Sequence, residues 1–216
     1  MKYLLALLSV VLLLPGTSRA DSLFLSTGNS ALSGYPGNYA KLDITFLDST
    51  HASVSLTSLV HGSNIYLFGG SGLLGLNVNG TASVSNLTGA NSGHGFDSPS
   101  LSADGPKNLD GFGQFNLTIN GFDGYTHTVD SLSFNLTDTS GTWGSARDVL
   151  APNANGYLAA GHVFVAEYPA SACEGALATG YAAGGSCTQP TPEPATLVLF
   201  GIGAVGLAGY AWRRRQ

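Results

Sequence analysis

Hydrophobic and polar residues alternate with a period of two along much of the chain from Lys41 onward. A strand that buries one face and exposes the other requires this period. About eight short strands separated by turn residues indicate a mainly β fold, an antiparallel β-sandwich or jelly-roll-like body. The alternating segments are residues 42–46, 52–57, 74–78, 82–84, 115–119, 125–129, 132–136 and 163–165.

Turn residues between these segments predict how the strands connect. Asn79-Gly80 and Asn120-Gly121 each end an alternating segment. Asn-Gly favours a two-residue hairpin because both turn residues must take positive φ, so we expect a hairpin at each pair and another at residues 48–51. Residues 89–111 break the alternation and predict a long loop, and residues 139–162 predict a short helix or an irregular segment.

The N-terminus has the three parts of a secretory signal peptide. A basic start at Lys2 precedes an apolar run from Leu4 to Leu14, and small residues lead to Ala20. As a helix the run would span about 16 Å, which is too short for a hydrocarbon core of about 30 Å. Residues 1–20 are therefore expected to be a signal peptide cut after Ala20, which exports the rest of the chain.

A second apolar run, Ala195 to Trp212, lies near the C-terminus and is followed by Arg213-Arg214-Arg215. As a helix it would span about 27 Å, marginally enough to cross a bilayer. The arginines would be held on the cytoplasmic side and would anchor the topology. The sequence thus predicts a transmembrane helix whose orientation agrees with an exported body.

The same region carries a family resemblance. Pro192-Glu193-Pro194, the apolar run and the arginine cluster resemble the tripartite PEP-CTERM sorting signal of exopolysaccharide-producing Gram-negative bacteria. The resemblance covers residues 192–216. It implies that an exosortase, a membrane protease or transpeptidase, recognises Pro192, Glu193 and Pro194 and cuts nearby. Transient anchoring in the inner membrane would then give way to a place at the cell surface, or in the extracellular polysaccharide of a biofilm.

The region before the sorting signal divides by composition. Residues 21–169 hold the predicted sandwich, and residues 170–191 are rich in Ala, Gly and Thr and predict a stalk. Cys173 and Cys187 are the only cysteines of the chain. In an oxidising compartment such a pair favours a disulfide, with two free thiols as the alternative. Closing this loop would stabilise the fold by about 3 kcal/mol in the chain-entropy model.

Charge narrows the range of partners. Only 10% of residues are charged, against about 25% in an ordinary domain. Residues 21–190 contain three basic residues against twelve acidic ones. Such a segment would repel phosphate backbones, so nucleic acid is excluded as a partner. Ser- and Thr-rich outward strand faces could instead carry sugars or hydrogen-bond to them.

The motifs of catalysis and cofactor binding are weak in this chain. Residues 70–75, Gly-Ser-Gly-Leu-Leu-Gly, fit the dinucleotide-binding pattern, but a strand and turn follow where the motif needs a helix. We therefore expect no cofactor. No H-E-x-x-H or G-x-S-x-G is present, so no catalytic residue is nominated. The histidines are scattered, at His51, His61, His94, His127 and His162.

One weak metal hypothesis remains. Asp104, Asn108 and Asp110 offer oxygen ligands suited to calcium in a glycine-containing loop. Their spacing does not fit an EF-hand, so a loop of Asx turns is favoured and no metal is expected. The sequence predicts a non-enzymatic exported protein associated with exopolysaccharide. The alternatives are a carbohydrate-active enzyme with two carboxylates in a cleft and a calcium-dependent lectin.

Overall fold

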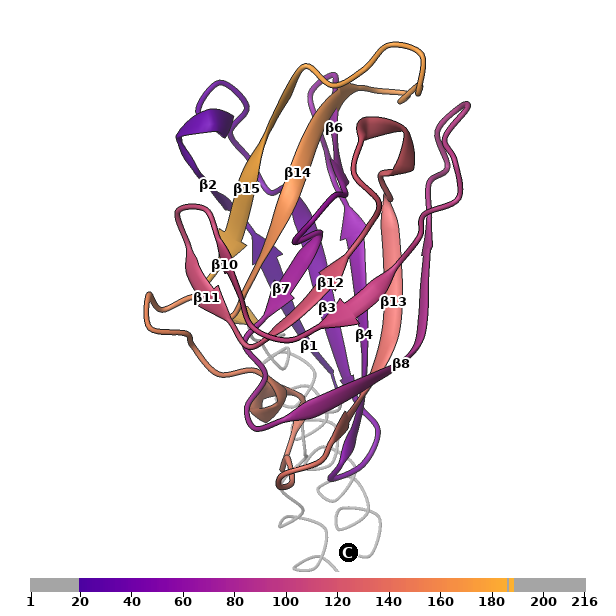
Figure 1. The fold of residues 1–216 in the computed structure, drawn as a ribbon. Helices are drawn as coiled ribbons and strands as arrows, with labels where there is room; N and C mark the ends of the chain where they lie inside the picture. The colour runs from indigo at the N-terminus through magenta and orange to yellow at the C-terminus, as the bar shows by residue number, and fades with distance from the viewer. Residues whose placement is uncertain (1–19, 186, 189–216) are drawn as a thin grey trace, which may run out of the picture.

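The computed structural model describes residues 20–185 and 187–188 (Figure 1). These residues form two large antiparallel sheets and a small separate hairpin, which confirms the predicted mainly β, antiparallel fold. Their helical segments are short 3₁₀ turns, η1 (Ser30–Leu32), η2 (Tyr125–His127) and η3 (Ala146–Val149). Within this part of the chain no helix is long and apolar enough to cross a membrane. Residues 1–19 of the predicted signal peptide and the whole predicted transmembrane helix lie outside the described residues.

Sheet A contains the clearest alternating segments of the sequence. Its strands pair in the order β16-β1-β3-β4-β13-β8. On β3, β4 and β13 every second side chain is buried while most of the intervening ones are polar, as a period of two requires. The strands are β1 (Ala20–Leu25), β3 (Ala40–Phe46), β4 (His51–Ser58), β8 (Ala82–Ala90), β13 (Ser131–Asp138) and β16 (Cys187–Thr188).

Sheet B packs against sheet A and has the order β2-β15-β14-β7-β12-β9. One side of β14 pairs with β15, and the other side pairs first with β7 and then with β6, which also carries β5. A separate hairpin joins β10 (Lys107–Leu109) to β11 (Gly113–Phe115). The strands of sheet B are β2 (Thr27–Gly28), β5 (Val60–His61), β6 (Asn64–Phe68), β7 (Leu74–Leu76), β9 (Ser102–Asp104), β12 (Leu117–Asn120), β14 (Ala159–Glu167) and β15 (Ala178–Gly184).

The main hydrophobic core lies between the two sheets. Inward side chains of both sheets belong to a single buried cluster, among them Leu42 and Phe134 from sheet A and Phe68 and Leu76 from sheet B. Trp143 joins this cluster from the loop before η3, and its indole N–H donates to the carbonyl of Asn79 over 2.9 Å. Burial of each large apolar side chain contributes about 1.5–3 kcal/mol. The alternation in the sequence thus supplies one buried face for each layer of a sandwich.

Local turn signals predicted one hairpin correctly and two wrongly. The turn at residues 48–51 joins β3 to β4 as expected, and the Asp48 carboxylate accepts from the backbone N–H groups of Thr50 and His51. After Asn79-Gly80 and after Asn120-Gly121, however, the chain leaves sheet B and enters sheet A. Gly80 does take a positive φ of 102°, so a turn forms there. The turn chemistry specifies the reversal of the backbone, while burial between the sheets decides the partner strand.

The segment predicted as a stalk contains two strands, β15 and β16, in its described part. Within residues 170–191, β15 pairs along its whole length with β14 and partly with β2. Ala182 and Ala183 are fully buried there. The composition of small residues predicts a stalk, but in β15 these small side chains allow close packing. A Cβ added at Gly184 would lie 2.4 Å from the carbonyl oxygen of Phe24 and 2.8 Å from the side chain of Leu23.

The structure also contradicts the predicted disulfide, because Cys173 is a free, exposed thiol. Cys173 lies in the loop before β15, whereas Cys187 follows β15 and pairs through its backbone with Leu23. The seven residues of β15 separate the two positions by roughly 20 Å at the rise of a strand. A disulfide requires Cα atoms within about 7 Å. The side chain of Cys187 itself lies outside the described residues.

Three further segments differ from their expectations. The predicted loop of residues 89–111 contains β9 and β10, and the predicted strand at residues 125–129 is η2 followed by a single bridge from Val129 to Phe68. The segment 139–162 does contain a short helical turn, η3. Strands β1 and β2 have no counterpart in the prediction. β2, β9 and β10 are only two or three residues long, which is too brief to reveal a period. In β1 the apolar Phe24 stands between the buried Leu23 and Leu25 and hides the alternation.

Candidate functional site

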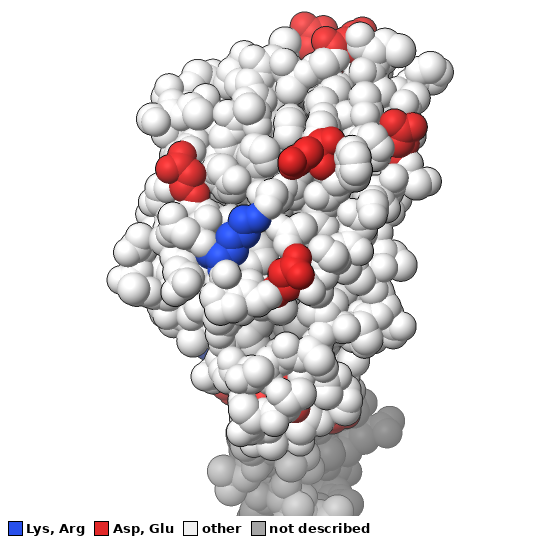
Figure 2. Space-filling view, viewed as in Figure 1, with Lys and Arg blue, Asp and Glu red and all other residues white. Residues whose placement is uncertain are grey.

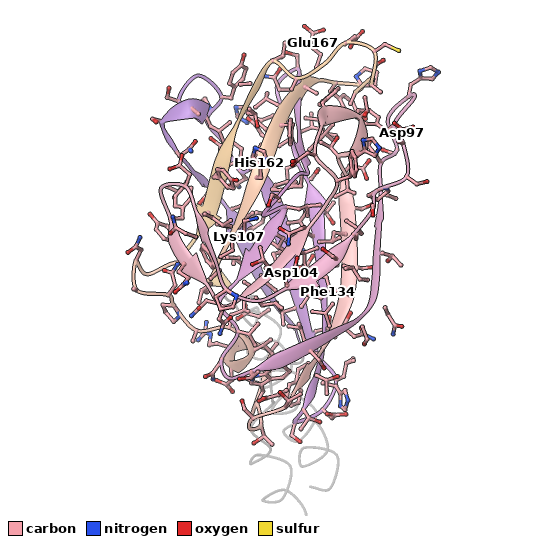
Figure 3. The ribbon with its side chains drawn as sticks, in the orientation of Figure 1. Asp97, Asp104, Lys107, Phe134, His162 and Glu167 are labelled. Carbon is pink, nitrogen blue, oxygen red and sulfur yellow. The ribbon has the colours of Figure 1, made fainter. Side chains whose placement is uncertain are left out.

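A group of polar side chains gathers on the outer face of sheet B. We call it the loop cluster and define it as Ser71, Asp104, Lys107, Asn120, Asp123 and His162. Its centre is the glycine loop between β6 and β7, which is the segment that matched the dinucleotide-binding pattern. In Figure 2 the main basic patch of this face is surrounded by acidic groups, and Figure 3 labels Lys107 at that position, between His162 and Asp104.

Side chains of the loop cluster bind backbone N–H groups of the glycine loop. Asn120 Oδ1 accepts from the N–H of Gly72 over 2.7 Å, and Asp123 Oδ1 accepts from the N–H of Ser71 over 3.2 Å. Gly72 has a φ of 80°, a conformation that favours glycine. Two loop amides that a dinucleotide phosphate would need are therefore already occupied by side chains from β12 and the loop after it.

Lys107 connects the members of the cluster. Its ammonium group donates to the hydroxyl of Ser71 and, over 3.4 Å, to Asn120 Oδ1. The amide of Asn120 in turn donates to the carboxylate of Asp104. Lys107 is the one cation of the cluster, which also contains the two carboxylates of Asp104 and Asp123. The polar atoms of the cluster are largely used on one another. Sequence reasoning missed this cluster because its members come from four separate segments of the chain.

His162 borders the cluster from β14. Its Nδ1 lies 3.0 Å from the carbonyl of Gly69 and must carry a hydrogen to donate there, while Nε2 lies 2.8 Å from the hydroxyl of Thr179. The ring stacks on Tyr181 with centroids 4.7 Å apart. Burial lowers the pKa of His162 below 6.5, against the opposing effects of the Gly69 carbonyl and Asp123. The neutral ring is therefore the favoured form in the folded protein.

Two small hydrophobic clusters cover the outer face of sheet B on either side of the loop cluster. One is formed by the β10–β11 hairpin, where Leu109 and Phe115 pack on Ala160 of β14. The other includes Leu67 of β6 and Ala170. The face is therefore partly a second buried layer. It is not an open platform for a ligand.

The weak calcium candidates do not converge. Asp104 accepts from Asn120 on β12, whereas Asp110 accepts from the side-chain amide of Asn29 over 3.2 Å. Asn108 lies on β10 and is exposed. Among the described residues there is no group of three or more His, Cys, Asp or Glu side chains that could hold a metal ion. The three residues form separate hydrogen bonds or face solvent.

The outer face of sheet A is different. Apart from His51 at the start of β4, its outward side chains on β4, β13 and β8 form an uncharged surface, which we call the hydroxyl face. Across it lies a groove of about 230 Å³. The hydroxyl face consists of Ser53, Ser55, Thr57, Ser83, Ser85, Thr88, Ser131, Ser133, Asn135 and Thr137.

A second and larger groove, of about 720 Å³, lies where the sandwich opens between β8 and β9. Its lining includes Val84 and Leu117 together with the carboxylate of Asp104. Asp104 is the single carboxylate among the described residues that line it. Hydrolysis of a glycosidic bond by the usual mechanism needs two carboxyl groups on either side of that bond. This groove does not provide such a pair.

Comparison with known proteins gives one match, at the C-terminus. The model of the PEP-CTERM protein-sorting motif matches residues 190–215. No curated protein and no solved structure matches the chain. The chain therefore combines a β-sandwich body with a C-terminal sorting signal. That signal is a PEP-CTERM motif, which implies an exported protein that is anchored in the membrane and then cleaved by an exosortase.

The matched range includes the residues that the sequence nominated for sorting, Pro192, Glu193 and Pro194 with Arg213, Arg214 and Arg215. All six lie outside the described residues, so their individual roles stay predictions. The last described element, β16, ends at Thr188. Every described strand therefore precedes the sorting motif.

Proposed function

We propose that this protein is a non-enzymatic component of the cell surface or the exopolysaccharide matrix of a Gram-negative bacterium. The observation that carries the proposal is the PEP-CTERM motif at residues 190–215. In this proposal an exosortase recognises Pro192, Glu193 and Pro194, and the apolar helix holds the chain in the inner membrane until cleavage. Arg213, Arg214 and Arg215 fix the orientation of that helix.

The position of the motif after the body supports this proposal. Cleavage near Pro192 would leave all the described strands in the mature protein, because β16 ends at Thr188. Cleavage after Ala20 would leave nearly all of β1, which pairs with β3 from Ala20 to Leu25. Both processing steps would therefore release a complete sandwich.

The use of polar groups in the body supports a non-enzymatic role. A catalytic nucleophile or base needs a free reactive atom beside the substrate. In the loop cluster, Lys107 and Asn120 are engaged with neighbours, and Nδ1 and Nε2 of His162 both have partners. Such a network stabilises a loop more readily than it transforms a substrate.

Intact-mass analysis of the protein recovered from its native host tests the proposal. We expect a species that lacks residues 1–20 and ends near residues 191–194. A control variant, Ser100→Ala, changes one exposed side chain of the body and should be processed in the same way. Replacement of Pro192 and Pro194 by alanine should leave the full C-terminus in the inner-membrane fraction. Recovery of wild-type protein that keeps Arg213-Arg214-Arg215 in the matrix would contradict the proposal.

A further inference from the structure

The hydroxyl face of sheet A is an array of polar side chains that is regular on β4 and β13 and is interrupted on β8 by a bulge between Ser85 and Thr88. The strand register aligns them in rows that cross β4, β13 and β8. Neighbouring strands lie about 4.8 Å apart and alternate residues about 6.7 Å apart along a strand, so the side chains form a grid of about 5 by 7 Å. The rows are Thr57 with Ser131, Ser55 with Ser133 and Thr88, Ser53 with Asn135 and Ser85, and Thr137 with Ser83.

Most of these side chains have no protein partner. Among the described residues of the hydroxyl face, the side-chain hydrogen bonds are those of Thr88, to the hydroxyl of Ser133 over 2.9 Å and weakly to its carbonyl. Each Ser or Thr hydroxyl supplies one donor and two acceptors. The face therefore keeps a large hydrogen-bonding capacity that the fold itself does not use.

Several of these hydroxyl groups line the groove together. It crosses all three strands, and its lining includes Ser55, Thr57, Thr88, Ser131 and Ser133. Its floor is the strand backbone, because the side chains of Leu56 and Leu132, which also line it, are 1% and 2% exposed and point into the core. A groove lined by small uncharged hydroxyl side chains matches a chain of sugar rings, which present hydroxyl groups at their edges.

The charge of the face excludes other partners. The lining of the groove has no charged side chain, and the nearest basic group on the sheet, Lys41 of β3, is paired with Asp43 over 2.8 Å. An anionic polymer would need free cations. A second copy of this chain would need an apolar patch of several hundred Å², but the large exposed hydrophobic side chains of the described residues all lie elsewhere, at Leu47, Val60, Phe122, Tyr168 and Leu177.

We infer that the groove of the hydroxyl face binds a neutral polysaccharide in an extended conformation. Single hydrogen bonds to sugar hydroxyls are weak because water competes for them. A polymer that engages many protein copies at once gains avidity from the repeated contacts. The inference deepens the proposed function, and it rests on that proposal for the setting in which the protein would meet such a polymer.

Affinity electrophoresis tests this inference on the protein recovered from its host, whichever C-terminus it carries. Native gels would contain hydroxyethylcellulose or galactomannan as neutral glycans, or alginate as an anionic one. We expect a neutral glycan to slow the protein and alginate to leave it unaffected. The variant Ser55→Ala/Ser133→Ala should bind roughly tenfold more weakly, because two groups that bond to the glycan are lost.

The matched control is Ser98→Ala/Ser100→Ala, which removes two exposed hydroxyls from the loop before β9 and should bind as the wild type does. A second variant, Ser133→Asp, places a charge in the groove and should abolish the retardation while urea unfolding confirms that the variant is folded. Retardation by alginate alone, equal retardation of all variants, or no retardation in either neutral glycan would overturn the inference. A dimer of the wild-type protein that the groove variants convert to monomers would also overturn the inference. Because mass analysis tests sorting separately, either proposal can fail while the other stands.

Discussion

The outer faces of the two sheets both carry polar side chains but use them in opposite ways. On sheet B, Asn120 and Asp123 accept from the backbone N–H groups of a glycine loop. Lys107 donates to Ser71 of that loop and to Asn120. On sheet A, Asn135 and most of the hydroxyls beside it have no side-chain partner among the described residues. Sheet B therefore uses its polar groups for the stability of the fold, whereas sheet A leaves them available for another molecule.

The difference follows from what covers each sheet. Loops and the β10–β11 hairpin pack on sheet B and bring their polar side chains within hydrogen-bonding distance of one another, even where these side chains stay exposed. Sheet A has no such cover over β4, β13 and β8, where the groove is open. Asn120 and Asn135 show that one residue type on a strand is structural or available according to whether loops pack over its sheet.

The largest expected effect comes from a substitution in the core between the sheets, because it destabilises the support of both outer faces. Phe134 of β13 is 1% exposed in the core between the sheets (Figure 3). Phe134→Ala should lower the free energy of unfolding by about 3–5 kcal/mol, because a cavity forms between the layers. Urea unfolding monitored by tryptophan fluorescence measures the change. The control Phe122→Ala, at a side chain that is 56% exposed, should change it by about 0.5 kcal/mol or less, and equal losses would contradict the described core.

The second largest effect is found by comparing the loss of one asparagine on each outer face. Asn120→Ala removes the acceptor of the Gly72 N–H and a partner of Lys107, so the free energy of unfolding should fall by about 1–3 kcal/mol. The matched variant Asn135→Ala on the hydroxyl face should change it by about 0.5 kcal/mol or less. Both are measured by urea unfolding. Equal losses in the free energy of unfolding for the two variants would contradict the contrast between the two polar faces.

A smaller effect appears as a dependence on pH. Burial lowers the pKa of His162 in the fold below the value of 6.5. Below pH 6.5 the unfolded chain therefore takes up the proton more readily than the folded protein, so stability falls as pH drops towards the folded pKa. We expect the urea midpoint to decrease between pH 7.5 and pH 5.5, and His162→Gln to reduce this decrease. The exposed His51 serves as the control, since His51→Gln should leave the contribution of His162 in place.

The smallest effect concerns the loop beyond sheet B. Because Cys173 is a free, exposed thiol, Cys173→Ser should change the free energy of unfolding by about 0.5 kcal/mol or less. A disulfide at this position would make the loss about 3 kcal/mol. The folded wild-type protein should also react with a thiol reagent at Cys173 without denaturant. Protection of the thiol together with the larger loss would restore the original disulfide prediction.

The sequence by itself determined the class of the fold and the presence of a C-terminal sorting motif. Alternation of buried and polar residues on β3, β4 and β13 is a local property, and each strand records it in its own residues. The sorting motif at residues 190–215 is equally local, because a short contiguous segment carries all its parts. Both could therefore be predicted without knowledge of which strands pair.

Only the tertiary structure decided the partners of the strands and the use of their polar groups. The turn at Asn79-Gly80 joins two sheets, the Ala- and Gly-rich segment becomes β15 within sheet B, and Cys173 lies away from Cys187. The loop cluster and the hydroxyl face are likewise assembled from segments far apart in the chain. Pairing depends on the shared burial of the core, a sum over many distant residues, so no single segment contains the information.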